Sequence, residues 1–203
     1  MKRFLPPLVV LFVGTLSLGA TASLWVHERH AEHARLRAIF DFNLRQTATR
    51  IEQRIANYEQ MLRGVQGLFA ASHNKVDRAS FNAYVDALLA GSDFTGLQAI
   101  SYGPLLSADR VDAHIAAQRG ADAPGFAVRP PGPREAYAPA TYIAPATERS
   151  QGVLGYDPFS DPVRRAAMLQ ARDSGSAALT ARTALVADTQ GGSQPGFLMF
   201  LPL

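Results

Sequence analysis

Residues 4–26 contain no charged side chain, and this apolar run constrains the fold more than any other feature of the sequence. A run of ~20 apolar residues is long enough to cross a bilayer as one helix. Lys2 and Arg3 precede it, so the positive-inside rule predicts a cytoplasmic N-terminus and an exported remainder. A cleaved signal peptide is the alternative, because Ala20 and Ala22 resemble a small-residue cleavage site. We expect residues 1–26 to be a transmembrane anchor, and both alternatives export the rest of the chain.

An apolar seam follows the anchor and predicts a long, coiled-coil-like helix over residues 27–73. Its members are spaced three or four residues apart: Leu36, Phe40, Leu44, Thr47, Ile51, Ile55, Tyr58, Leu62, Val65 and Phe69. A seam stabilises a helix only when it packs on another surface, and a second copy of the chain and the domain's own sheet are both candidates. We expect a homodimer. His27, His30 and His33 are spaced so that two of them could share a metal ion, but we interpret them as a solvated surface.

Composition narrows the classes of function. With 203 residues, 47% hydrophobic and 18% charged, the chain fits a globular protein with one membrane segment. The net charge of +3 and the lack of a Lys/Arg tract argue against a nucleic-acid partner. The absence of cysteine excludes disulfides, cysteine zinc sites and thiol catalysis. The sequence also lacks a nucleophile elbow, a Walker loop and a glycine-rich dinucleotide turn, so we expect neither an enzyme nor a cofactor.

Residues 74–203 have the pattern of a mixed α/β domain. Asp77 is expected to cap a helix whose apolar face includes Phe81 and Val85, and a shorter helix is predicted at 109–119. Apolar or alternating segments predict strands, which lie at 97–102, 126–129, 136–143, 178–186 and 197–201. The sequence ends almost directly after the last of these strands, so we expect the chain to be part of a longer protein.

Residues 154–175 predict a turn that carries an acid and then a capped helix. Asp161 is a good N-cap, Pro162 suits the first helical position, and Gly175 is expected to be a left-handed C-cap. Asp157 lies upstream between Tyr156 and a proline. It either fixes the turn through its own backbone or presents a carboxylate to a ligand, and the local pattern favours the first interpretation.

Arg164 and Arg165 leave a second chemistry open, because an arginine near a helix N-terminus can hold an anion. We expect instead that one is solvated and that the other pairs with a nearby acid. A hydrolase would use Asp157 together with this arginine pair, and two acids converging in an open cleft would favour it. A closed apolar pocket with one acid would favour a sensor.

Six short motifs follow one another in the second half of the chain. They are residues 97–104, Tyr137-Ala138-Pro139 with Tyr142, residues 154–157, residues 164–166 with 171–175, Leu179-Thr180, and residues 196–202. In this order they resemble the CHASE domain, over residues 80–203. CHASE domains are the extracellular sensor modules of histidine kinases and of cyclic-nucleotide or diguanylate cyclases, including the plant cytokinin receptors.

The resemblance implies a long N-terminal helix followed by two PAS-like α/β lobes, with a small-molecule ligand in the membrane-distal lobe. Asp157 stands where an Asp of the cytokinin receptors hydrogen-bonds an adenine ring, and Tyr142, Leu179 and Thr189 would line the same pocket. The resemblance therefore implies the periplasmic sensor of an inner-membrane receptor, with a purine-like candidate ligand and no metal site. The hydrolase is one alternative. A structural dimerisation ectodomain is the other, which the absence of any pocket would favour.

Overall fold

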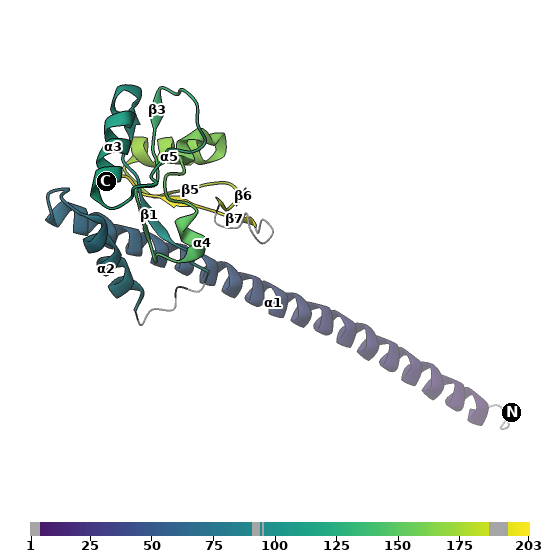
Figure 1. Ribbon diagram of the computed structural model, residues 1–203. Coiled ribbons are helices and arrows are strands. Elements are labelled where there is room, and N and C mark those ends of the chain that lie inside the picture. The colour runs from purple at the N-terminus through teal and green to yellow at the C-terminus, as the bar shows by residue number, and fades with distance from the viewer. Residues whose placement is uncertain (1–4, 91–93, 95, 187–194) are drawn as a thin grey trace. The chain divides into compact units, whose positions relative to one another are not determined.

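The computed structural model describes residues 5–90, 94, 96–186 and 195–203, without the side chains of 5–8, 24 and 26–34. The chain divides into two compact units, Met1–Ile55 and Ala56–Leu203. The helices are α1 (Leu5–Ala71), α2 (Arg78–Leu89), α3 (Val111–Ala121), α4 (Glu148–Gln151) and α5 (Pro162–Ser174), with short 3-10 turns η1 (Ala108–Arg110) and η2 (Pro158–Ser160) (Figure 1). The strands are β1 (Ile100–Tyr102), β2 (Leu106–Ser107), β3 (Ala136–Tyr137), β4 (Tyr142–Ala144), β5 (Ala178–Leu179), β6 (Thr183–Ala184), β7 (Pro195–Gly196) and β8 (Met199–Phe200). The expected mixed α/β character is confirmed.

The described structure of the first unit is the helix α1. The predicted long helix is confirmed, and α1 runs without interruption from Leu5 through the expected segment to Ala71. Four seam residues of this unit are exposed by 55–64%, namely Leu36, Phe40, Leu44 and Ile51, whereas Ile55 at its end is half-buried. Among the described residues, no helix is sufficiently long and apolar to cross a membrane. The structure describes only some of the side chains of the anchor expected at residues 1–26, and it does not describe the side chains of His27, His30 and His33.

The hydrophobic core of the second unit includes the last turns of α1. The buried members of this core are Met61, Val65, Phe69, Val76, Phe81, Val85, Ile100 and Ala144. Phe81 of α2 is fully buried, and its ring centroid lies 6.4 Å from that of Phe69 and 5.7 Å from that of Tyr142. The C-terminal part of the seam therefore packs against the domain itself, which was one of the two alternatives.

The end of α1 and the start of α2 lie close to the positions that the sequence predicted. α1 ends at Ala71, after which His73 and Asn74 adopt φ angles of 52° and 60°. Asp77 caps α2 as predicted, because its side chain accepts a hydrogen bond of 2.7 Å from the amide of Ser80. Short-range chemistry of this kind is fully encoded in neighbouring residues.

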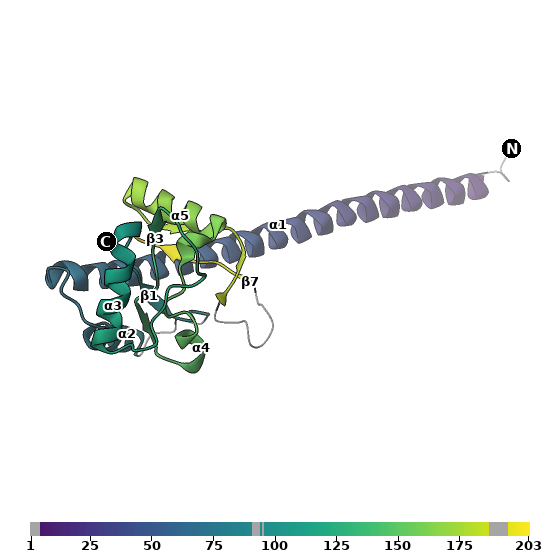
Figure 2. The ribbon, with the colours of Figure 1, turned by 45° about the horizontal axis from the view of Figure 1, so that its top comes forward.

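The strands are shorter than the sequence predicted. The strands of the described residues form four separate antiparallel pairs, β1–β4, β2–β3, β5–β8 and β6–β7. One strand from each of three pairs, β1, β3 and β7, is labelled in Figure 2. The segments 136–143 and 178–186, each expected to be one strand, are both interrupted. The strand expected at 126–129 is wrong, because that segment makes only an isolated bridge between Arg129 and Tyr156. The two PAS-like lobes stay a prediction.

Candidate functional site

The turn at residues 154–157 is the point where two other segments converge. Gly155 donates its amide to the carbonyl of Ala140 (2.8 Å) and accepts from the amide of Arg129 (2.9 Å). The carbonyl of Tyr156 accepts from Ala140 (2.9 Å), and the amide of Asp157 donates to Arg129 (2.7 Å). The two bonds of Arg129 make the isolated bridge to Tyr156, and the four bonds together fix the backbone that carries Asp157.

Asp157 is fully buried, and both carboxylate oxygens are hydrogen-bonded. Oδ1 accepts from the amides of Ala138 (2.9 Å) and Phe159 (3.0 Å). Oδ2 accepts from Nε of Arg134 (3.1 Å), whose guanidinium carbon lies 4.7 Å from the centre of the Tyr137 ring. The bond to Phe159 is the turn-fixing bond that the first interpretation of Asp157 expected. A buried carboxylate is tolerated only when it is paired and hydrogen-bonded, and Arg134 supplies the pairing charge.

The other residues expected to line the pocket lie in different places. Tyr142 of β4 is half-buried, its hydroxyl donates to the carbonyl of Val76 (3.0 Å), and burial raises its pKa. Leu179 of β5 is 38% exposed. Thr189 lies outside the described residues. Asp157 and Tyr142 line neither of the two hollows described next, and Leu179 lines the second of them.

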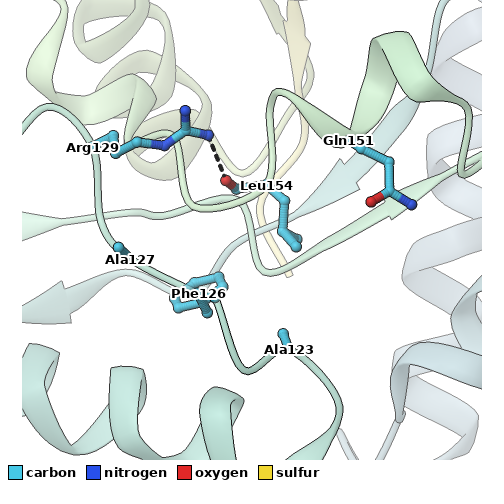
Figure 3. A pocket seen from close by; sticks show the side chains of 7 residues that line it. Ala123, Phe126, Ala127, Arg129, Gln151 and Leu154 are labelled. Atoms are coloured by element: carbon cyan, nitrogen blue, oxygen red, sulfur yellow. Dashed lines mark hydrogen bonds between the residues drawn. The ribbon is translucent and has the colours of Figure 1, made fainter.

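Two open hollows are present on the described part of the second unit. The first, of about 440 Å³, is lined by Ala123, Gly125, Phe126, Ala127, Arg129, Gln151 and Leu154 (Figure 3). In it, Nη2 of Arg129 donates to the carbonyl of Leu154 at 2.8 Å (Figure 3). The same Nη2 also donates to the carbonyl of Gly152 at 2.8 Å. The second hollow, of about 470 Å³, lies against α5 and β5 and includes Leu179. No acidic side chain lines either hollow, so neither has the paired carboxylates of a glycosidase-type site.

The two arginines at the start of α5 differ in burial, and only one of them has the environment that the sequence predicted. Arg165 is exposed, as predicted for one member. Arg164 is only 5% exposed, and its Nη2 donates to the carbonyl of Ala184 (2.6 Å). The acid expected beside it is missing, because within the described ranges no ion pair involves Arg164. Its guanidinium carbon lies 4.9 Å from the centre of the Tyr156 ring.

A polar network that the sequence analysis missed joins α2, α3 and Thr141, which directly precedes β4. Arg78 donates from Nε to the carboxylate of Asp122 (2.9 Å) and from Nη1 to the carbonyl of Thr141 (2.8 Å). Nε2 of His114 lies 3.0 Å from Oγ1 of Thr141. Because that hydroxyl donates to the carbonyl of Pro139 (3.0 Å), His114 is the donor, and burial lowers its pKa. Arg134 was missed too, since a residue next to a proline-rich loop gives no sequence signal of its distant partner.

Comparison with known families identifies the second half of the chain. The family model of the CHASE domain matches residues 74–203. The chain belongs to the CHASE domain family. A CHASE domain is a sensory, non-catalytic domain of signalling receptors, which confirms a sensory role and agrees with the expectation that this chain is not itself an enzyme. No curated protein matches the chain.

Proposed function

We propose that this CHASE domain is the periplasmic, ligand-sensing part of an inner-membrane receptor, either a sensor histidine kinase or a diguanylate cyclase. The CHASE match over residues 74–203 carries the proposal, because this family senses signals for membrane receptors. The uncharged run at 4–26, with Lys2 and Arg3 before it, supports membrane anchoring and export. The ligand is a small molecule, and a purine-like ring is the candidate.

Asp157 is the residue that we propose to contact the ligand, with Tyr142, Leu179 and Thr189 as the further lining. Its Oδ1 accepts hydrogen bonds from two backbone amides, whereas Oδ2 accepts a hydrogen bond from the Arg134 side chain. Moving the Arg134 side chain would break no bond between backbone groups, although its Nη2 also donates to the carbonyl of Pro130 (2.9 Å). A ligand N–H can therefore replace Arg134 at Oδ2, and a ligand without such a donor would leave a buried charge unpaired, which is costly.

The long helix offers the route by which binding would be transmitted. Met61, Val65 and Phe69 of α1 are buried in the same core as α2, so a change in packing of this core acts directly on α1. A ligand shifts such an equilibrium by its difference in affinity for the two arrangements. We further propose that the exposed seam residues between Leu36 and Ile51 pack against a second copy of the chain.

Thermal denaturation with adenine as the probe tests the ligand contact. Adenine should stabilise the wild-type chain, and Asp157→Asn should weaken binding by ~2 kcal/mol, about thirtyfold, because a charge-assisted bond is lost. Arg134→Ala removes the competing donor and should bind at least as tightly as the wild type. Asp161→Asn is the matched control, since it makes the same change at a half-buried helix cap and should leave the adenine response unaltered.

Two results would reject parts of this proposal. An Asp157→Asn protein that melts at a lower temperature but binds adenine normally would leave Asp157 with its turn-fixing role alone. A wild-type chain that adenine does not stabilise would reject the purine-like ligand. A structural dimerisation ectodomain predicts the second result together with intact self-association.

A further inference from the structure

Arg164 is a buried cation that the sensor proposal does not use. It occupies the first turn of α5, directly after the cap Asp161 and Pro162, and is 5% exposed. One hydrogen bond, from Nη2 to the carbonyl of Ala184, is formed at 2.6 Å. Nε is buried and has no hydrogen-bond partner. Leaving a charged donor buried without a partner is unfavourable, so an additional acceptor at Nε would stabilise Arg164.

The nearest acids along the chain are already engaged elsewhere. Asp161 Oδ1 accepts from the backbone amides of Val163 (2.9 Å) and Arg164 (3.0 Å), which makes it the helix cap. Asp157 is paired with Arg134. No ion pair in the part of the chain that the structure describes neutralises the guanidinium of Arg164. What faces it is the ring of Tyr156, at 4.9 Å, and a ring face attracts a cation without neutralising it.

The two nitrogens concerned form one edge of the guanidinium group. Nε–H and one Nη2–H point in parallel, and this edge matches the two oxygens of a single oxyanion. In Arg164 this edge has a carbonyl at Nη2 and no acceptor at Nε. We propose that this edge of Arg164 binds a small oxyanion, the carboxylate or phosphate group of a ligand.

The carbonyl that now occupies Nη2 belongs to a weakly held surface segment. Ala184 is exposed, and its strand β6 has two residues that pair only with the two residues of β7 (Figure 1). A charged oxygen is a stronger acceptor than a neutral carbonyl, so an oxyanion can replace Ala184 at Nη2 and also satisfy Nε. This site is separate from Asp157 and stands or falls independently of the purine proposal.

Isothermal titration of the 203-residue chain with sodium phosphate and with sodium acetate tests this site, with chloride holding the ionic strength constant. We expect saturable binding of at least one of the two anions by the wild type. Arg164→Met should weaken it about tenfold or more, which is the loss expected for a charge-assisted bidentate contact. Arg165→Met, which removes an exposed arginine from the same helical turn, should stay within about twofold of the wild type.

Two further variants make the result unambiguous. Arg164→Lys keeps the charge and loses the planar edge, so it should also bind more weakly, and it decides the question if Arg164→Met does not fold. Asp157→Asn should bind the anion normally, which distinguishes this site from the proposed purine contact. A wild type that binds neither anion saturably would overturn the proposal, as would unchanged binding by a folded Arg164 variant.

Discussion

Gly155→Ala should destabilise the sensor domain by about 2–5 kcal/mol, for two separable reasons. The φ angle of Gly155 is +78°, and an alanine in the left-handed region costs about 1–2 kcal/mol. A Cβ added there would also lie 2.2 Å from the carbonyl oxygen of Ala127, far inside the contact distance. Gly155 is held from both sides by its bonds to Ala140 and Arg129, so the backbone cannot move away without straining them, at about 1–3 kcal/mol.

Two other glycines separate these terms. Gly175 has a φ of +65° and open space where its Cβ would lie, so Gly175→Ala should show the backbone term alone, about 1–2 kcal/mol. Gly120 lies inside α3 with nothing near its Cβ position, and Gly120→Ala should stabilise the helix by about 0.5–1 kcal/mol. The expected order of stability is therefore Gly120→Ala, wild type, Gly175→Ala and then Gly155→Ala.

Urea denaturation followed by near-ultraviolet circular dichroism measures these differences. The only tryptophan is Trp25, which lies in the first unit, so its fluorescence does not report on the sensor domain. The ring centroids of Tyr102 and Tyr142 lie 5.6 Å apart in the core, so these tyrosines give a circular dichroism signal from the second unit. If Gly155→Ala lowers the free energy of unfolding no more than Gly175→Ala does, the backbone at Ala127 moves away from the new Cβ without cost, and the steric part of the reasoning is wrong.

Three other predictions follow from the core and from the long helix. Phe81→Ala should lower the free energy of unfolding by about 3–5 kcal/mol in the same urea assay, because the fully buried ring leaves a cavity, and a loss under 1 kcal/mol would contradict this packing. The pKa of His114 is lowered by burial, so the unfolded chain binds more protons than the folded chain, and the free energy of unfolding should fall as the pH drops from 6.5 to the lowered pKa. His114→Gln should flatten this dependence of the unfolding free energy on pH. An unchanged dependence would exclude His114 as its cause. A cysteine at the exposed Ile51 should crosslink to its twin in membranes, whereas one at Gln53 should do so poorly, and equal crosslinking would argue against a dimer seam.

Features set by neighbouring residues could be predicted from the sequence. Asp161 caps α5 through the amides of Val163 and Arg164, and Gly175 ends the helix with a φ of +65°, both as expected. Asp77 begins α2 in the same way. Each of these outcomes depends on contacts that span only a few residues, so the local chemistry decides them without reference to the rest of the fold.

Features set by distant partners could not be predicted. Residues 136–143 carry the alternation of one strand, but the amide of Ala138 bonds to Asp157 and that of Ala140 to Tyr156. These bonds replace the ladder in the middle of the segment, and only β3 and β4 remain as strands. The partner Arg134 of the candidate site was missed for the same reason, since 23 residues separate it from Asp157.

The turn-fixing interpretation of Asp157 and the proposed ligand contact do not exclude each other. The two carboxylate oxygens have different kinds of partner: Oδ1 accepts from the backbone amides that fix the turn, and Oδ2 accepts from the side chain of Arg134. An asparagine can keep a carbonyl oxygen toward the amides and so retain the turn bonds, but its NH2 group would face the Nε–H of Arg134, so Asp157→Asn removes the Oδ2 acceptor and leaves Arg134 without its counter-charge, which should lower stability. The turn-fixing role and the proposed ligand-binding role thus use different atoms of one side chain, so adenine binding and thermal stability have to be measured together on Asp157→Asn.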